Sequence, residues 1–503
     1  MTNDLENFSK DQISAYDAVT ETLKFAGVDL TQELLSPKAT KNSFVLGVIG
    51  RAGTGKTLLI SKLFHALELL GVNIITGDYE SRKVREERSL AILAPTNKAA
   101  SVLRNKGVPA TTLHRILYTP IYDPEYEKIA EWLLGNTERP DNDSFEKSIL
   151  DRIIEFYKVN KSIPGALASA GLKGSDFIKG WKRRDEPLDI GFVDEASMLD
   201  NQQFEDLKEI FSYLILFGDP AQLAPINQSE KMIFDAIPED NKYFLSQIHR
   251  QKNDNPILEL ANKLQDPDVD FHLFDQLVKE ASIIDDRIIY SQRVNIDLMA
   301  LSPVLVWRNS TRIRLINAFR EAHMINETEL LVGEPLICDG IELPLKHRKK
   351  RIDLEARGLV KGAHVIYLGP GRKPGFSRLH ILGSEDPQVS AASIVKIEKP
   401  DIEEPFIPFA ARMGAIFLHG AAVTIHKSQG SQWEQVQVIA NDLAVAANTG
   451  RIESGQPLWK RLTYVAITRA QHRLNWVTRN RLSKPQIALD SIKSVSYTHL
   501  RAH

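Results

Sequence analysis

The chain has 503 residues, a length that suggests two to four domains, and its 43% hydrophobic and 25% charged residues exclude wholesale disorder. Its 63 basic residues nearly balance 65 acidic ones, so any nucleic-acid binding must come from a local groove rather than from bulk positive charge. The single cysteine, Cys338, excludes an intrachain disulfide and a zinc site built from cysteines.

The sequence contains no signal that directs a chain to a membrane. No apolar run reaches the roughly 18 residues that a membrane-spanning helix needs. The acidic and polar start, MTNDLENFSKDQ, does not resemble a secretory signal. We therefore expect a cytoplasmic protein with no membrane partner.

One pattern recurs along the chain: a short apolar run, a break at Gly, Pro, Thr or Asp, and then an amphipathic stretch. It begins with SFVLGVIG, is repeated at LAILAPT and DIGFVDE, stops near residue 235 and resumes near 303. Such runs are typical of buried parallel strands that alternate with helices. The pattern predicts an α/β fold with two α/β domains.

Two segments interrupt this pattern, and the end of the chain does not fit it. Residues 119–188 contain two helical stretches and a basic patch, LKGSDFIKGWKRR. Residues 331–415 are rich in Gly, Pro and β-branched residues, which predicts a small β-rich insertion. The last residues, 493–503, include SVSYTHLRAH, which resembles a translated sequencing adaptor, and we exclude them from the fold argument.

The segment GRAGTGKT, from Gly50 to Thr57, matches the phosphate-binding pattern G-x-x-x-x-G-K-[ST]. It follows an apolar strand and opens a helix, where backbone N–H groups and the helix N-terminus attract phosphate. We expect Lys56 to reach the β and γ phosphates of ATP and Thr57 to bind Mg²⁺. The phosphate cradle is expected to comprise Gly50, Gly53, Thr54, Gly55, Lys56 and Thr57.

Carboxylates follow another apolar run, IGFV, at the predicted carboxyl end of a strand, where α/β sheets bind ligands. Asp194 is expected to hold Mg²⁺ and Glu195 to polarise the attacking water. Gln222, in GDPAQLAPI after the next buried strand, is placed to sense the γ-phosphate.

Eight motifs now occur in one order: GRAGTGKT, APTNKAA, TTLHRIL, DEAS, GDPAQLAPI, IHRQ, TIHKSQG and YVAITRA. Their series resembles superfamily-one DNA helicases of the RecD and Dda type, which move 5′ to 3′, and it is most similar to the phage Dda-like group. The resemblance runs from Asp11 to Val477. It implies two RecA-like P-loop domains in tandem, with a helical and hairpin insertion in the first and a small β-barrel-like insertion in the second.

The resemblance also implies domain boundaries and further site residues. The first RecA-like domain is expected at 1–118 and 189–238, the second at 239–330 and 416–492. Gln12, in FSKDQISAY, matches the glutamine with which the family binds adenine. A side-chain amide suits this role because it both donates and accepts hydrogen bonds. Arg250 and Arg469 match the two arginines that the second domain directs at the γ-phosphate, where a fixed positive charge stabilises phosphoryl transfer.

The family's strand-contacting motifs imply a nucleic-acid groove. Its expected residues are Pro95, Thr96, Thr112, His114, Thr424, His426 and Lys427. Hydroxyl, imidazole and backbone N–H groups of this kind hold phosphates without selecting a sequence. Trp181, Trp307 and Trp433 are candidates for stacking on bases, with core packing or a solvated loop as the alternative. LYTPIYDPEY begins like the hairpin, or pin, with which the family separates the strands of a duplex. Helical stretches follow it, so the sequence does not establish which residues form the pin.

The resemblance predicts an ATP-dependent DNA helicase, with Mg²⁺ as cofactor, acting as a monomer on single-stranded DNA and forked duplex. Replication or recombination proteins are possible partners. Three alternatives stay open: a single-strand translocase that does not separate strands, a RecD-like subunit of a recombination–repair complex, and a P-loop switch protein unrelated to nucleic acid. The last leaves TIHKSQG and TTLHRIL unexplained.

Overall fold

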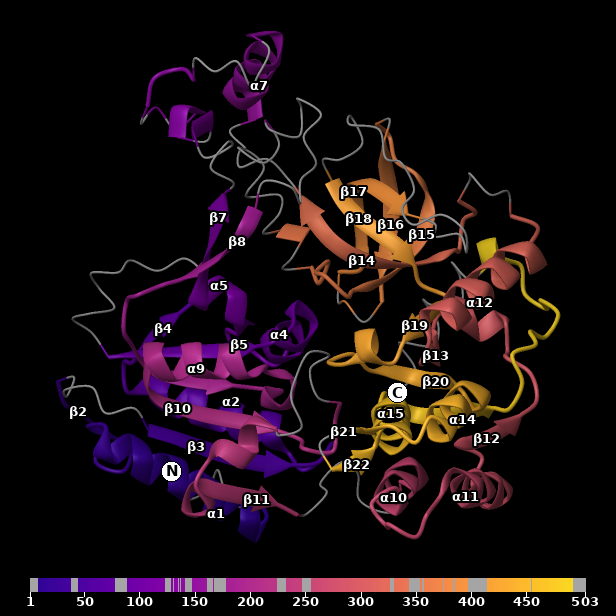
Figure 1. The fold of residues 1–503 in the computed structure, drawn as a ribbon, viewed down its shortest axis with the longest axis horizontal. Helices are drawn as coiled ribbons and strands as arrows, with labels where there is room; N and C mark the ends of the chain where they lie inside the picture. The colour runs from indigo at the N-terminus through magenta and orange to yellow at the C-terminus, as the bar shows by residue number, and fades with distance from the viewer. Residues whose placement is uncertain are drawn as a thin grey trace.

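The computed structural model describes most of the chain. The described residues are 8–37, 44–76, 88–122, 128–129, 131–133, 135, 137–140, 147–160, 166, 178–223, 232–246, 255–325, 330–342, 353–354, 357–373, 375–382, 384, 386–396, 414–453 and 455–491. Two open sheets with helices on their faces form the lower part of the molecule in Figure 1, and a barrel lies above the second sheet.

The first sheet is parallel and has the strand order β11-β3-β10-β9-β5-β4, with β6 beside β5. Its strands are β3 (Phe44–Gly50), β4 (Asn73–Ile75), β5 (Ser89–Ala94), β6 (Thr111–Thr112), β9 (Leu188–Val193), β10 (Phe211–Gly218) and β11 (Lys242–Leu245). The central runs are apolar and almost wholly buried because helices cover both faces of the sheet.

Each face of the first sheet packs against its own set of helices. On one face lie α1 (Lys10–Phe25), α2 (Lys56–Leu69) and α4 (Asn97–Arg104). On the other lie α5 (Leu113–Leu117) and α9 (Asn201–Ile210). The carboxyl ends of the strands therefore emerge between two helical layers.

The second sheet is also parallel and has the order β12-β23-β20-β13-β19. Its strands are β12 (Ile288–Ser291), β13 (Val304–Val306), β19 (Ala422–Thr424), β20 (Trp433–Ile439) and β23 (Ala470–Val477). One face is covered by α10 (Pro256–Lys263), α11 (Phe271–Ile284), α14 (Ala440–Asn448) and α15 (Leu458–Ile467), the other by α12 (Asn309–Ala322). Two tandem α/β domains with parallel sheets confirm the predicted fold class.

The β-rich insertion closes into a barrel in the order β14-β15-β16-β17-β18. Its strands are β14 (Pro335–Glu342), β15 (His364–Pro370), β16 (Phe376–Ile381), β17 (Gln388–Lys396) and β18 (Gly414–His419). A buried ionic cluster joins the barrel to the second domain: the Glu334 carboxylate lies 3.2 Å from Nε2 of His419 and 3.4 Å from Nε of Arg320. Glu334 directly precedes the first barrel strand and His419 ends the last one, so the cluster fixes the start and the end of the insertion to α12.

The first insertion leaves and re-enters its domain as an antiparallel ribbon of β7 (Tyr118–Tyr122) and β8 (Ile178–Arg183). We call these two strands the stalk. Beyond the stalk, α7 (Lys147–Asn160) lies at the far end, at the top of Figure 1. The hairpin-like start at LYTPIYDPEY thus forms one strand of the stalk as far as Tyr122, and its next residues lie outside the described part of the chain.

Three predicted boundaries differ from the structure. Strand β11 pairs with β3 in the first sheet, so this sheet extends beyond residue 238, where we expected the first domain to end. The last barrel strand reaches His419 rather than ending by 415. At 188 the chain has already entered β9. Strand pairing decides where each domain begins and ends. These boundaries are hard to predict because the paired strands lie far apart in the sequence.

Residues 493–503 and Arg250 lie outside the described residues. Among the helices that the structure describes, none has the length and apolar character that crossing a membrane requires.

Candidate active site and nucleic-acid groove

The loop between β3 and α2 forms a phosphate cradle. Gly53 and Gly55 both have positive φ, at 88° and 85°, and Gly55 caps the N-terminus of α2. The Lys56 ammonium is folded into the loop and donates to the carbonyl oxygens of Gly50 and Arg51 at 2.5 and 2.9 Å. A phosphate that enters the cradle would replace these carbonyls as the partner of Lys56.

Gln12 lies directly behind this loop and is almost fully buried. Its Nε2 donates to the Thr54 carbonyl at 2.8 Å, and its Oε1 accepts from the backbone N–H of Ser9 at 3.0 Å. A side chain on Gly55 would lie only 2.1 Å from Gln12 Nε2, so only glycine fits there. The expected adenine-binding residue is therefore at the cradle and also fixes the loop to α1.

Asp194 and Glu195 follow β9, at the carboxyl edge of the first sheet. Burial, and next the charge of Glu195, raises the pKa of Asp194 to about 7. Glu195 has φ 53° and ψ 37°, a left-handed conformation that costs a non-glycine residue on the order of 1 kcal/mol. Local strain of this kind clusters at functional sites, and here it affects the residue expected to polarise water.

Gln222 contacts this carboxylate pair. Its Nε2 donates to Oε2 of Glu195 at 3.0 Å, while its own Oε1 is buried without a hydrogen-bond partner among the described residues. The Gln222 amide and the Glu195 carboxylate therefore form one hydrogen-bonded pair at the edge of the sheet. The two side chains together can orient an attacking water.

The second domain reaches the cradle through α15. The Tyr464 hydroxyl donates to the Asp219 carboxylate at 2.7 Å, and the N–H of Ala52 in the loop lies 3.0 Å from that carboxylate and 3.3 Å from the hydroxyl. Burial, followed by the charge of Asp219, raises the pKa of Tyr464 well above its usual value. Tyr464 therefore stays a donor that links the two domains at the phosphate loop.

Arg469 lies just beyond the end of α15 and is almost fully buried. Its guanidinium donates to the carbonyls of Val465 and Ser431 at 3.0 and 3.3 Å. Burial lowers its pKa, and the negative charge of Glu195 acts in the opposite direction. The arginine therefore lies within electrostatic reach of the carboxylate expected to act on water.

Sequence reasoning missed three side chains at this junction: Asp219, Tyr464 and Arg461. Arg461 donates from Nη1 to the Gln222 carbonyl at 2.6 Å and thereby holds the glutamine from the second domain. Asp219 and Tyr464 lie inside GDPAQLAPI and YVAITRA, so the motifs located them without giving their roles. Arg461 precedes YVAITRA by three residues, and no sequence pattern indicated that it has a role at the site.

The carboxylates of the site fit a divalent cation. Buried Asp194 faces a second negative charge, and a cation would remove the penalty that raises its pKa. Asp194 and Thr57 would hold Mg²⁺, which neutralises charge on transferring phosphates when bound. The described residues contain no cluster of three or more His, Cys, Asp or Glu side chains that could hold a metal by themselves. The phosphates would therefore complete the coordination.

A cleft of about 570 Å³ lies between the first domain, the second domain and the barrel. It is lined by six of the seven residues expected to contact nucleic acid: Pro95, Thr96, Thr112, His114, His426 and Lys427. Thr424 ends β19 and does not line the cleft. Motifs from the two domains, more than 300 residues apart in the sequence, thus meet in one groove.

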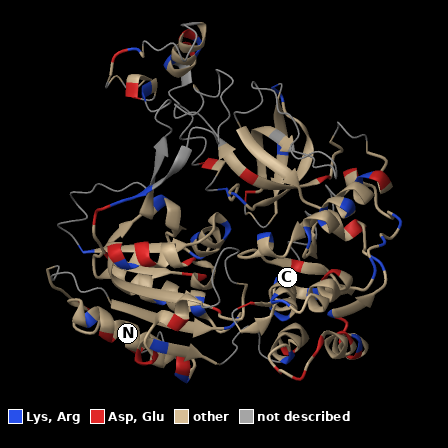
Figure 2. Cartoon of the chain, viewed as in Figure 1, with Lys and Arg blue, Asp and Glu red and all other residues tan. Residues whose placement is uncertain are grey.

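Four cations and one carboxylate line this groove. The basic residues of the lining are Lys98, Arg312, Lys361 and Lys427, and its acidic residue is Asp339. Lysine and arginine are otherwise interspersed with acidic residues over the molecule (Figure 2), in keeping with its near-zero net charge. The local excess suits the phosphate backbone of a nucleic acid. Lys98 lies inside APTNKAA but was not singled out there, and Arg312 and Lys361 lie outside all the motifs.

The two domains meet closely beside the groove, at the start of α4. Thr96 caps α4, with its Oγ1 accepting from the Ala99 N–H at 3.1 Å. A Cβ on Gly430, which has φ 73°, would lie 3.1 Å from that same Oγ1. The TIHKSQG segment therefore needs glycine to pass the start of α4.

The tryptophan candidates differ in their surroundings. Trp433 lines the groove and meets the ring of His364 edge-on, with 6.4 Å between centroids. Trp307 packs against the second-domain core and does not line the groove, which favours core packing. Trp181 is paired with Pro120 in the stalk, and its side chain lies outside the described part of the structure. Stacking on bases thus remains a prediction for Trp433 and Trp181.

Comparison with protein families agrees with this geometry. The AAA domain family model matches residues 31–285, which is half of the chain. This chain belongs to the AAA domain family. Residues 419–477 of this AAA domain protein also match the UvrD-like helicase C-terminal domain. The two matches place it among superfamily-one helicases, while the RecD and Dda subgroup stays a prediction.

The AAA domain protein also has a curated relative and similar solved structures. An uncharacterised protein of Acanthamoeba polyphaga mimivirus is 24% identical over 205 residues, which are 39% of this chain and 32% of that relative. The Pif1 helicase from Candida albicans is 16% identical with a TM-score of 0.46, covering 97% of this chain and 99% of that one. Bacteroides Pif1 bound to ssDNA is 14% identical with a TM-score of 0.46, covering 98% and 97%.

Proposed function

We propose that this chain is an ATP-dependent DNA helicase that moves 5′ to 3′ along single-stranded DNA and hydrolyses ATP between its two α/β domains. The observation that carries the proposal is the junction at the phosphate loop, where Ala52 of the first domain meets Tyr464 of the second. Arg469 follows five residues after Tyr464, just beyond the end of α15, so this helix and the residues after it bring both an interdomain link and a cation to the site.

Hydrolysis follows from the described side chains. Lys56 and the loop N–H groups bind the phosphates, and Glu195 with Gln222 orients the attacking water. Arg469 stabilises the charge that develops on the γ-phosphate. Because these groups come from two domains, the geometry favours a closed arrangement when ATP is bound and an open one after hydrolysis.

Movement along DNA follows from the shared groove. The groove is lined by Thr96 and His114 of the first domain and by His426 and Lys427 of the second. A change in the spacing of the domains at the ATP site therefore changes the spacing of their grips on one strand. Alternating grips convert each cycle of hydrolysis into a step. We further propose a monomeric motor that acts on forked duplexes in DNA replication, repair or recombination.

The test is an ATPase assay with and without single-stranded DNA, followed by unwinding of forked substrates with a 5′ or a 3′ tail. We expect DNA to raise turnover at least about tenfold and unwinding to need the 5′ tail, with Lys56→Ala as the inactive control. ATPase activity that ignores DNA would contradict the proposal. DNA-stimulated turnover that displaces bound protein but separates no strands would favour the translocase instead.

A further inference from the structure

The stalk is a two-stranded ribbon that leaves the first domain at the groove. Such a ribbon is only marginally stable in water by itself. Its residues Tyr118 and Arg183 are register partners at the base of the ribbon. Whatever holds these two residues also sets the direction in which the stalk points.

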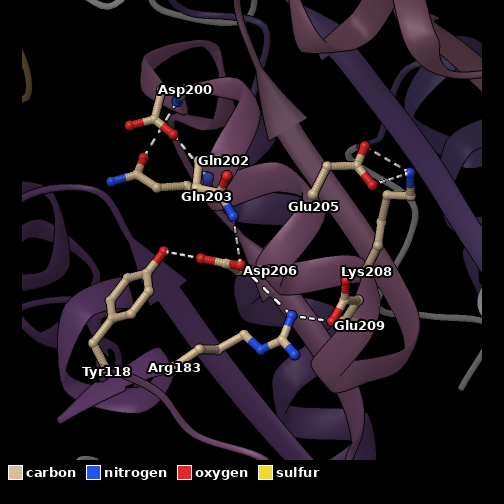
Figure 3. Close-up of polar contacts among 9 residues, drawn as sticks. All are labelled: Tyr118, Arg183, Asp200, Gln202, Gln203, Glu205, Asp206, Lys208 and Glu209. Atoms are coloured by element: carbon tan, nitrogen blue, oxygen red, sulfur yellow. Dashed lines mark hydrogen bonds and ion pairs between the residues drawn. The ribbon is translucent and has the colours of Figure 1, made fainter. Parts of the chain in front are cut away.

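Both residues are bound to one helix, α9. The Tyr118 hydroxyl donates to Oδ2 of Asp206 at 2.5 Å, and Nη1 of Arg183 lies 3.7 Å from Oδ1 of the same carboxylate. Arg183 also pairs with Glu209 (Figure 3). Asp206 and Glu209 are three residues apart and share one face of the helix. Each strand of the stalk is thus anchored at its base to the same surface.

Asp206 is the centre of this network, because its side chain is buried and both of its oxygens are occupied. Gln202 donates to Oδ1 at 3.0 Å from one turn earlier in α9. A buried carboxylate inside a helix is costly unless it is hydrogen-bonded and paired. Burial, and then Asp206, raises the pKa of Tyr118, so its hydroxyl stays protonated and keeps donating. The contacts with the stalk therefore explain why a charged residue, Asp206, occupies a buried position of α9 that would otherwise suit an apolar residue.

The same network is joined to the groove through Tyr118 and to the core of the first domain through α9. The ring of Tyr118 packs on that of His114, with 4.9 Å between centroids, and His114 lines the groove. Helix α9 begins six residues after Glu195, and its Phe204 and Leu207 are part of the core beneath the sheet. The base of the stalk is therefore fixed to the rigid part of the motor.

We propose that Tyr118 and Asp206 are positioning residues that lock the stalk onto α9, so that the ribbon can bear the push of the motor against a duplex. The inference rests on the proposed helicase function and adds to it the coupling of movement to strand separation. A stalk without this anchor would bend away when it meets paired strands, while hydrolysis on single-stranded DNA would continue.

The test compares Tyr118→Phe and Asp206→Asn with Glu205→Gln. Tyr118→Phe removes only the hydroxyl and keeps the ring on His114, whereas Asp206→Asn keeps the shape and removes the charge that Arg183 faces. Glu205 pairs with Lys208 on another side of α9 (Figure 3), so it is a matched control. Three quantities are measured on the full chain: amide exchange of β7 and β8, ATP turnover with single-stranded DNA, and forked-duplex unwinding.

We expect both anchor variants to exchange stalk amides about tenfold faster and to unwind about tenfold more slowly, with turnover within about twofold of wild type. Glu205→Gln should change none of the three. Stalk exchange at the wild-type rate, or an equal fall in turnover and unwinding, would overturn the inference. If the wild type does not respond to DNA, the proposed function fails, and the exchange rates alone still decide whether Tyr118 and Asp206 anchor the stalk.

Discussion

At the scale of single residues, the chemistry of the site depends on side chains held in unfavourable surroundings. Glu195 has a left-handed backbone, Asp194 is a buried carboxyl, and Arg469 is a buried guanidinium held by carbonyl oxygens. The motifs predicted which residue types occupy these places, because phosphate chemistry requires them. The strain and the burial come from packing and have no sequence signature.

Arg469→Ala should leave ATP binding within about threefold of wild type and lower turnover at least about a hundredfold, since the arginine acts on charge that develops during transfer. Turnover and nucleotide affinity are measured in parallel. Arg473→Ala is the control, because Arg473 lies on the adjoining β23 with its side chain about half exposed. A loss of affinity that matches the loss of turnover would contradict the assigned role.

At the scale of elements, parallel strands place the motifs at one edge, and buried polar contacts fix the strands to each other. Arg88, directly before β5, pairs with Asp189 of β9 at 2.5 Å and also donates to the carbonyl of Ala26 at the end of α1. The apolar runs predicted the central strands well. The pairing of β11 with β3 escaped prediction because KYFL is short and carries no information about its neighbour.

Asp189→Ala should lower the free energy of unfolding by about 3 kcal/mol, because it leaves the buried guanidinium of Arg88 without its counter-charge. Urea unfolding followed by circular dichroism measures the change. Exposed Asp185 provides the control: Asp185→Ala should cost less than about 0.5 kcal/mol. Equal stability of the two variants would mean that the pair contributes little to the sheet.

At the scale of the whole molecule, the groove exists only because three parts of the chain meet. The first domain contributes Lys98, the second contributes Arg312 and Lys427, and the barrel contributes Lys361. The cluster of Glu334, His419 and Arg320 holds the barrel on α12 and so fixes one wall of the groove. The net charge gave no hint of this basic surface, because acidic residues elsewhere cancel it.

Lys361→Ala should weaken binding of single-stranded DNA equally for different sequences, because the lysine meets phosphates and not bases. The slope of log affinity against log salt should fall by about 0.7, the value expected when the protein neutralises one phosphate fewer on a single strand. Fluorescence anisotropy over a salt series measures both effects. Exposed Lys373, also in the barrel, is the control, and an unchanged slope in Lys361→Ala would exclude Lys361 from the DNA-binding surface.

The sequence by itself determined the alternation of buried strands and helices, the phosphate loop, the carboxylate pair and the order of the motifs, because each depends on local residue chemistry and spacing. Only the tertiary structure decided that Tyr464 meets the phosphate loop, that Arg461 holds Gln222, and that α9 anchors the stalk. The hydrogen bonds of Tyr118 to Asp206, Arg461 to Gln222 and Ala52 to Tyr464 join residues 88, 239 and 412 positions apart in the sequence. Their partners are chosen by the packing of whole elements, which no local pattern records.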